Sequence, residues 1–209
     1  MAMTPYVIKQ GDYLAKLAHE LGFDLATILD HEKNAELKKK RPDPNVLYPG
    51  DVLFVPEPEP PSTPVAQGTS NDYGAKVPTV KVTLVFEGDG KPMANQPCEV
   101  DGLPETSATT DGQGEVTFEV PVNVREFTVT LTGTDYQYQV MVAHVDPPTE
   151  QSGLRQRLTN LGHYRRASDP EDAEAFAGAV ASFQAASSLP QTGEVDDATR
   201  DAIVAAHGS

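Results

Sequence analysis

The sequence predicts an α+β protein built from several small modules, because the spacing of its apolar residues changes twice along the chain. Residues 1–56 join two β-prone runs to segments of helical spacing, residues 77–146 alternate apolar and polar side chains, and residues 147–209 return to helical spacing. Residues 57–76 are rich in Pro, Ser, Thr and Gly and lack apolar periodicity, which is typical of an extended linker. We therefore expect a βααβ module, a linker, an antiparallel β-sandwich and a three-helix bundle.

The first module is expected to begin and end with a strand, at residues 6–9 and 52–55. Asp12 is placed to cap a helix that starts at the next residue, and Gly22 stands where that helix would end in a left-handed conformation. Asp24 can cap a second short helix. The two strands would pair as a two-stranded antiparallel sheet.

The middle module carries several runs in which apolar residues recur at every second position, separated by Asp-Gly turns. Within each run, the residues expected to share one face are Val80, Val82, Leu84 and Phe86 in the first, Val116, Phe118 and Val120 in the second, Phe127, Val129 and Leu131 in the third, and Tyr136, Tyr138, Val140 and Val142 in the fourth. The segment TTDGQGEVTF resembles the strand-turn-strand of immunoglobulin-like and prealbumin-like modules. Cys98 alternates with Val100 in a β-prone run, so we interpret it as a packed apolar side chain rather than a nucleophile.

Helical spacing in the last module predicts three helices. Ser152 can cap the first, Asp169 and Pro170 can start the second, and Asp196 can begin the third, which should end near Gly208. The apolar residues expected on the inner sides of these helices are Leu154, Leu158 and Leu161, then Phe176, Val180 and Phe183, then Ala198, Ala202 and Ile203.

The charge of the chain argues against two classes of partner. The formal net charge is −15, and residues 57–150 hold 15 acidic but only 4 basic side chains, a field that repels nucleic acid and anionic membranes. No segment offers the ~20 apolar residues needed to span a bilayer, and no apolar stretch near the start suits a classical signal peptide. We expect a protein made in the cytoplasm without such a signal, with no nucleic-acid partner and no membrane span.

The inventory of reactive side chains disfavours catalysis. The five histidines are scattered, and none has a metal-ligand spacing with Asp, Glu or another His. No elbow motif presents a nucleophile, and Asp196-Asp197 is better explained as a helix start than as an acid and base pair. Cys98 is the only cysteine, so no internal disulfide can form. We expect no metal, no cofactor and no enzymatic activity, with a hydrolase or toxin of unrecognised chemistry as the alternative.

Three segments of the first module, YVIKQGDYLAKLAHELG, DLATIL and DPNVLYPGDVLFVP, resemble the LysM domain. The resemblance implies a shallow groove for N-acetylglucosamine-containing glycans between the loop after the first strand and the loop before the second. Carried over by position, the glycan-binding residues are Gly11, Asp12, Tyr13, Leu14, Asn34, Leu47, Tyr48, Pro49 and Gly50. Tyr13 and Tyr48 would pack against a sugar face. The structural alternative is that Gly11 and Gly50 only permit turns and that Tyr48 covers the core.

Two segments of the last module, SGLRQRLTNLGHY and AFAGAVASFQAASSLPQTGEVDDATRDAI, resemble the peptidoglycan-binding domain often appended to cell-wall hydrolases. The Leu-Gly-His-Tyr turn, Phe183-Gln184 and the loop at residues 192–196 before Thr199 carry this resemblance. The loop at residues 165–171 departs from it, because the usual Asp-Gly and Gly-Thr pattern is missing there.

Two groups of basic residues allow two interpretations each. The run at residues 38–41 and the arginines of the last module, Arg155 and Arg165 among them, could form solvated faces or contact a carboxylate of a wall peptide. In the second interpretation Arg155, Tyr164 and Arg165 are the wall-peptide contacts.

Two wall-type modules on one chain favour a non-catalytic bacterial peptidoglycan-binding protein that acts in the periplasm or cell wall, because linked weak sites gain affinity through effective concentration. The partner would be an N-acetylglucosamine-containing glycan, with the stem peptide as a further candidate. The alternative is an accessory protein of a contractile injection system, since the architecture is similar to that of such proteins in type VI secretion systems and phage tails. In that role the LysM fold would dock onto a secretion or tail spike protein.

Overall fold

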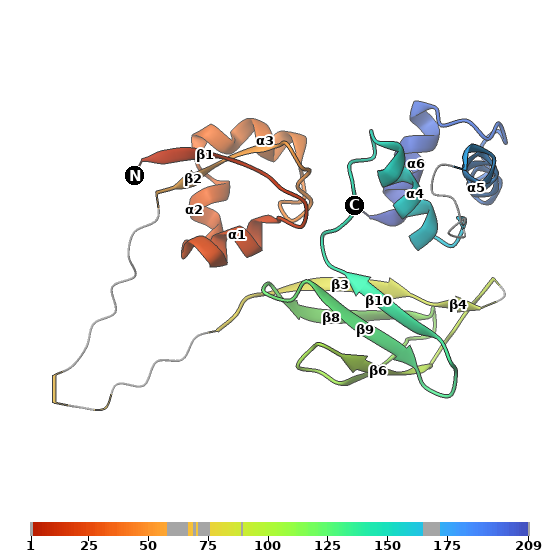
Figure 1. Ribbon diagram of the computed structural model, residues 1–209, viewed down its shortest axis with the longest axis horizontal. Coiled ribbons are helices and arrows are strands. Elements are labelled where there is room, and N and C mark those ends of the chain that lie inside the picture. Colours follow the sequence, from red (N-terminus) through yellow and green to blue (C-terminus); the bar gives the residue numbers. More distant parts are fainter. Residues whose placement is uncertain are drawn as a thin grey trace. The chain divides into compact units, whose positions relative to one another are not determined.

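The computed structural model describes residues 2–57, 67–68, 70, 76–88, 90–164 and 172–208. Its contacts divide the chain into two units, Met1–His144 and Val145–Ser209. The first unit combines an N-terminal helical module with antiparallel sheets, and the second is helical (Figure 1). The protein is therefore a mixture of helix and antiparallel sheet with helices at its C-terminal end, as predicted. Most of the predicted linker at residues 57–76 lies outside the described residues.

Two antiparallel strands, β1 (Met3–Val7) and β2 (Val52–Pro56), begin and end the N-terminal module. The segments between them are α1 (Leu14–Leu21), α2 (Leu25–Leu29), the 3-10 helix η1 (Glu32–Asn34) and α3 (Ala35–Lys40) (Figure 1). The buried core of this module comprises Ile8, Leu14, Leu17, Ala18, Ile28, Leu53 and Val55. Apolar spacing of 3.6 in the helices and of two in β2 turns these side chains inward.

Two details of this module differ from the prediction. The first strand ends at Val7, so the expected strand at residues 6–9 is wrong at its C-terminal end. The carbonyl oxygen of Ile8, just beyond the strand, accepts a hydrogen bond from the backbone N–H of Gly50. The added helical segments η1 and α3 were not predicted. The sequence AELKKK of α3 consists of good helix formers, and Glu36 pairs with Lys39 one turn later at 2.8 Å.

The helix ends of the N-terminal module confirm one expected cap and correct two. Gly22 ends α1 in the left-handed region with φ 74°, as predicted. The N-cap of α1 is Tyr13, and Asp12 makes no capping bond, because its carboxylate is engaged with the preceding turn. Asp24 occupies the N-cap position of α2, but its side chain accepts no capping hydrogen bond.

Three antiparallel sheets follow in the first unit. The four-stranded sheet has the order β10-β9-β6-β7, while β3 pairs with β8 and β4 pairs with β5. The bounds of these strands are Thr79–Val85 (β3), Glu87–Gly88 (β4), Lys91–Pro92 (β5), Pro97–Asp101 (β6), Ser107–Thr109 (β7), Glu115–Pro121 (β8), Glu126–Leu131 (β9) and Gln137–Met141 (β10). The alternation of buried and exposed residues along β6, β8 and β9 is the pattern expected of strands with one buried face.

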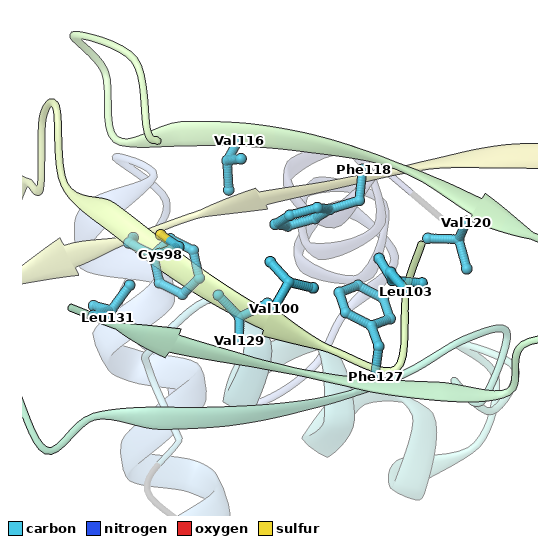
Figure 2. Packing of buried hydrophobic residues seen from close by; sticks show 10 residues of the cluster. Cys98, Val100, Leu103, Val116, Phe118, Val120, Phe127, Val129 and Leu131 are labelled. Atoms are coloured by element: carbon cyan, nitrogen blue, oxygen red, sulfur yellow. The ribbon is translucent and has the colours of Figure 1, made fainter. Parts of the chain in front are cut away.

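One core joins the four-stranded sheet to the β3–β8 pair. Figure 2 shows side chains of β8 and side chains of β6 and β9 pointing toward one another. Phe118 from β8 meets Phe127 from β9 edge to face, with ring centroids 5.4 Å apart. Cys98 is only 2% exposed in this core, and burial raises the pKa of its thiol, so its predicted role as a packed side chain is confirmed.

The prediction for one residue of this module is wrong. Tyr136 was expected on the core face but is 61% exposed, because β10 begins only at Gln137 and Tyr136 lies in the preceding turn. Tyr138 is partly exposed and packs on Phe86, with ring centroids 5.1 Å apart. The period-of-two pattern therefore identified the strand but placed its start one residue or more too early.

The second unit contains three helices, α4 (Gln151–Asn160), α5 (Ala173–Ala186) and α6 (Asp197–His207) (Figure 1). Their buried residues are Leu154, Leu158, Tyr164, Ala179, Val180, Phe183 and Ile203. The carboxylate of Asp196 accepts a hydrogen bond from the Thr199 N–H at 2.8 Å, and Gly208 ends α6 with φ 83°, so both predicted ends of this helix are confirmed.

Other predictions for this unit are corrected or lie outside the described residues. Ser152 lies within α4 rather than at its N-cap, which is Glu150. The cap of α5 is Asp172, whose carboxylate accepts from the Ala175 N–H at 2.9 Å. The predicted start at Asp169 and Pro170 lies outside the described residues. Ala198 is exposed, and its neighbour Thr199 is buried in its place.

The start of α4 is fixed by close contact with the chain that precedes it. A Cβ at Gly153 would stand 2.2 Å from the Pro147 carbonyl oxygen, so only glycine allows this approach. Arg157, which is 1% exposed, donates to the carbonyl oxygens of Asp146 at 2.7 Å and Gly153 at 3.0 Å. Gln156 accepts a hydrogen bond from the Asp146 N–H at 2.6 Å.

Candidate functional site

The residues expected to bind a glycan in the N-terminal module are only partly brought together. Leu14, Asn34 and Leu47 line one hollow, whose free volume of about 10 Å³ holds at most one water molecule. Gly50 lines a separate, open hollow of about 430 Å³. The other residues that line it are Asp51, three residues of α3 and Val52 at the start of β2. The smaller hollow has no room for an acetamido group in this conformation.

Asn34 is a structural side chain in this fold. It is 1% exposed, and its amide nitrogen donates to the carbonyl oxygens of Ile28 and Phe54, both at 2.8 Å. Its amide oxygen accepts from the Phe54 N–H at 2.8 Å. Both amide donors and the amide oxygen are therefore engaged in holding the end of α2 against β2.

Asp12 closes the turn after β1. Its carboxylate accepts hydrogen bonds from the Lys9 N–H at 3.0 Å and the Tyr6 hydroxyl at 2.9 Å, and it pairs with Lys16 at 3.1 Å. Burial alone would raise the pKa of Asp12, but these hydrogen bonds and the ammonium outweigh it and lower the pKa. Burial and the bond to Asp12 together raise the pKa of Tyr6 to about 12. Asp12 thus acts within the turn, where Lys16 also donates to the Gly11 carbonyl oxygen at 2.9 Å.

Neither of the two tyrosines expected to stack on a sugar has a free ring. The ring of Tyr13 is buried, and the ring of Tyr48 contacts a cation. Tyr13 is 3% exposed, packs with Ala15 and Val122, and donates its hydroxyl to the Val122 carbonyl oxygen at 3.1 Å. This burial contradicts the expected stacking of Tyr13 on a sugar face. The guanidinium carbon of Arg41 lies 3.6 Å from the ring centroid of Tyr48, which is a cation–π contact.

Asp51, which organises the second predicted loop, was not predicted as a site residue. This carboxylate is 6% exposed, accepts from the Tyr48 N–H at 3.0 Å and from Arg41 Nε at 2.8 Å, and pairs with Lys40 at 2.8 Å. Burial would raise the pKa of Asp51, but its hydrogen bonds to Arg41 and Lys40 lower it to about 2. The Pro-Gly-Asp sequence of a turn was a signal for such a carboxylate, because Asp in turns commonly bonds nearby backbone N–H groups.

The remaining predicted groove residues lie in two turns, Gly11 after β1 and Pro49 and Gly50 before β2. Gly11 and Gly50 have φ of 80° and 90°, so both need the left-handed region, and the Gly50 N–H donates to the Ile8 carbonyl oxygen at 2.9 Å. Pro49 is exposed beside Gly50.

The cations of the basic run at residues 38–41 are matched by carboxylates. Lys38 forms an ion pair with Asp30, and Lys39 forms one with Glu36, both at 2.8 Å. Lys40 and Arg41 share Asp51.

A buried glutamine in the second unit holds the loop between α5 and α6. Gln184 is 1% exposed, and its amide nitrogen donates to Thr192 Oγ1 at 3.1 Å, the Glu194 carbonyl oxygen at 2.9 Å and Thr199 Oγ1 at 3.1 Å. Its amide oxygen accepts from the backbone N–H groups of Thr192 and Gly193. The Phe-Gln pair and the loop that carried the resemblance of this module are thereby joined in one hydrogen-bond network.

Residues 152–203 match the family model described as "Putative peptidoglycan binding domain". The matched range includes nearly all of α4, all of α5, the loop held by Gln184 and most of α6. Neither the curated proteins nor the solved structures include a significant match to the chain. No LysM family model matches. The comparison supports cell-wall binding through the C-terminal unit.

Two of the three expected wall-peptide contacts lie together in this unit. Arg155, on α4, has its guanidinium carbon 5.9 Å from the ring centroid of Tyr164 and 5.1 Å from that of Phe176, on α5. Arg165 lies outside the described residues. Phe176 was expected only in the core. Its contact with Arg155 could not be predicted from local spacing, because that contact joins two different helices.

The described residues show no metal centre and no spanning helix. Within them, no group of three or more His, Cys, Asp and Glu side chains is arranged to hold a metal ion. In the same part of the chain, no helix combines the length and apolar character needed to cross a membrane. The histidines of the second unit make local contacts, such as that of His163 Nδ1 with Ser182 Oγ at 3.1 Å.

Proposed function

We propose that the chain is a non-catalytic peptidoglycan-binding protein whose C-terminal unit supplies the main contact with the wall. The match of residues 152–203 to a peptidoglycan-binding family carries this proposal. The Arg155, Tyr164 and Phe176 cluster supports it, because aromatic rings and a guanidinium suit a ligand that combines apolar groups with carboxylates. The site of action would be the periplasm or cell wall.

The N-terminal module would supply a second, weaker contact with N-acetylglucosamine-containing glycan. Within the predicted groove Pro49 and Gly50 are exposed, and an open hollow lies beside Gly50. A second weak site raises the overall affinity when both sites reach the same polymer.

The alternative role for the N-terminal module is docking onto a protein of a contractile injection system, such as a secretion or tail spike protein. The observation that favours it is the engagement of Asp12, Tyr13 and Asn34 in internal contacts, which leaves few groups for a sugar. The cross-strand neighbours Val7 and Val52 are 56% and 45% exposed on the outer face of the β1–β2 sheet, where an apolar partner surface could lie.

Co-sedimentation of the full chain with insoluble wall material tests these roles. Pelleting with purified sacculi but not with cellulose would support wall binding, and failure to pellet with sacculi would overturn it. Pelleting with chitin as well would support glycan binding by the N-terminal module, whereas pelleting with sacculi alone would favour protein docking. Loss of turbidity of the sacculi would contradict the non-catalytic assignment.

A further inference from the structure

We infer that Arg155 and Tyr164 form a binding site for a carboxylate of the peptidoglycan stem peptide. This inference rests on the proposed wall binding and specifies which part of the polymer the C-terminal unit recognises. It follows from two buried hydrogen-bond donors that have no acceptor among the described residues.

The first part of the site is an arginine whose guanidinium lies near two aromatic rings. Arg155 is half-buried, and its guanidinium lies near the rings of Tyr164 and Phe176 at 5.9 and 5.1 Å. Such contacts restrict the side chain and reduce the entropy lost when a ligand binds. Within the described residues Arg155 forms no ion pair, so its charge is available to an external anion.

The second part of the site is the pair of unsatisfied donors. Arg155 Nε and the Tyr164 hydroxyl are buried, and neither makes a hydrogen bond within the described part of the chain. Tyr164 as a whole is only 7% exposed. A buried polar group without a partner destabilises the free protein, because its bonds to water are lost and not replaced. A carboxylate has two oxygens that can accept from both donors, and a charged acceptor makes these bonds stronger.

A second arginine on the same helix differs from Arg155 in this respect. Arg157, two residues further along α4, is 1% exposed and donates to the carbonyl oxygens of Asp146 and Gly153. The helix therefore carries one arginine that secures its own start and another whose Nε lacks an acceptor among the described residues. Arg200, on α6, also has a buried Nε without an acceptor among the described residues, but its guanidinium pairs with Asp197.

The chemistry of the wall polymer identifies the ligand. N-acetylglucosamine is neutral and offers hydroxyl and acetamido groups, whereas stem peptides carry free carboxylates next to small apolar side chains. A guanidinium bordered by aromatic rings fits the second combination, since the rings can contact methyl groups while the cation binds the carboxylate.

The test measures binding of the full chain to a synthetic stem tripeptide, L-alanyl-γ-D-glutamyl-diaminopimelate, and to the same peptide with its carboxylates amidated. Tyr164→Phe removes only the hydroxyl, and Arg155→Gln removes the charge. Arg125→Gln is the control, because Arg125 is exposed in the first unit and its substitution changes the net charge equally. Binding is followed by titration calorimetry and stability by the melting temperature.

We expect Tyr164→Phe to weaken binding of the acidic tripeptide by about tenfold, the loss expected for one hydrogen bond to a charged group. The melting temperature of this variant should stay the same or rise, because an unsatisfied buried hydroxyl is gone. Arg155→Gln should weaken binding at least as much, and Arg125→Gln should leave it unchanged. A merely structural role for the Tyr164 hydroxyl would instead lower the melting temperature.

Equal affinity for the acidic and amidated peptides, or unchanged affinity of Tyr164→Phe, would overturn the inference. Pelleting with sacculi separates this failure from failure of the proposed function. If the wild type pellets equally with intact sacculi and with sacculi stripped of their stem peptides, wall binding stands and the carboxylate site is rejected. If it pellets with neither and binds no tripeptide, both are rejected.

Discussion

The buried amide of Gln184 allows a quantitative test of what holds the loop before α6. Gln184→Met keeps the length of the side chain and removes five hydrogen bonds. Thr192 and Glu194 are exposed, so water can replace their lost bonds, whereas the hydroxyl of Thr199 is buried and Gly193 is half-buried. Counting roughly 1 kcal/mol for each of the two bonds to groups that water reaches poorly, we expect a loss of roughly 2 kcal/mol.

A loss of that size is readily measured in a unit as small as Val145–Ser209. One kcal/mol shifts the melting temperature of a domain of this size by about 4–8 °C, so Gln184→Met should lower it by about 10 °C. Differential scanning calorimetry gives the shift, and amide NMR signals of residues 145–208 assign it to this unit. Gln191→Met is the control, because Gln191 is exposed beyond the end of α5. If both variants melt within a few degrees of the wild type, the network does not anchor the loop.

Three further predictions concern stability. Asn34→Ala removes three hydrogen bonds and should lower the free energy of unfolding of the N-terminal module by roughly 2–3 kcal/mol in urea titrations. The pKa of Asp51 is lowered from its ordinary value of 3.8 to about 2 in the folded state, so the stabilisation from its charge should be complete above the higher value and lost as the pH falls toward the lower one. The urea midpoints of wild type and Asp51→Asn should therefore converge over that range. Gly153→Ala should lower the melting temperature of the C-terminal unit by several degrees, because the added Cβ would stand 2.2 Å from the Pro147 carbonyl oxygen.

Matched variants make these predictions decisive. Asn123 is exposed, so Asn123→Ala should leave the urea midpoint nearly unchanged. If Asn34→Ala also left the midpoint nearly unchanged, the structural role of Asn34 would be contradicted. A constant difference between wild type and Asp51→Asn at all pH values would show that the charge of Asp51 is not responsible. Gly178 lies in α5 with nothing within 4 Å of its Cβ position, so Gly178→Ala should stabilise the unit by about 1 kcal/mol. Stabilisation by Gly153→Ala as well would contradict the close approach of residue 147.

Local patterns predicted the type of most elements, because helices and strands have different periods of burial. The spacing around Phe118 and Val129 identified β8 and β9, and Gly22, Asp196 and Gly208 marked helix ends where backbone geometry requires those residue types. The short helix α3 was missed, because its six residues carry too few apolar positions to show a period. Tyr136 was misplaced, since alternation continues into the residue before β10, where the side chain is exposed.

The candidate sites could be predicted only as lists of residues. Asp12, Asn34 and Tyr48 follow from the resemblance of their segment to a known family, but their spacing carries no information on which groups stay free. The structure shows that Asp12 and Asn34 bind their own fold and that the Tyr48 ring meets Arg41. Arg155 and Tyr164 were predicted together, and their unsatisfied donors became visible only in the packed unit.

By itself, the sequence determined where helical and alternating spacing occur along the chain, the type of most helices and strands, and the C-terminal segment whose family match indicates wall binding. These features are local, because propensity, period and capping act over a few residues. Only the tertiary structure decided which polar side chains are used internally and which remain available, as with Arg157 and Arg155 on one helix. The partners of Asn34, Gln184 and Tyr13 lie from 6 to 109 residues away along the chain. Packing brings such groups together, and no local pattern encodes their pairing.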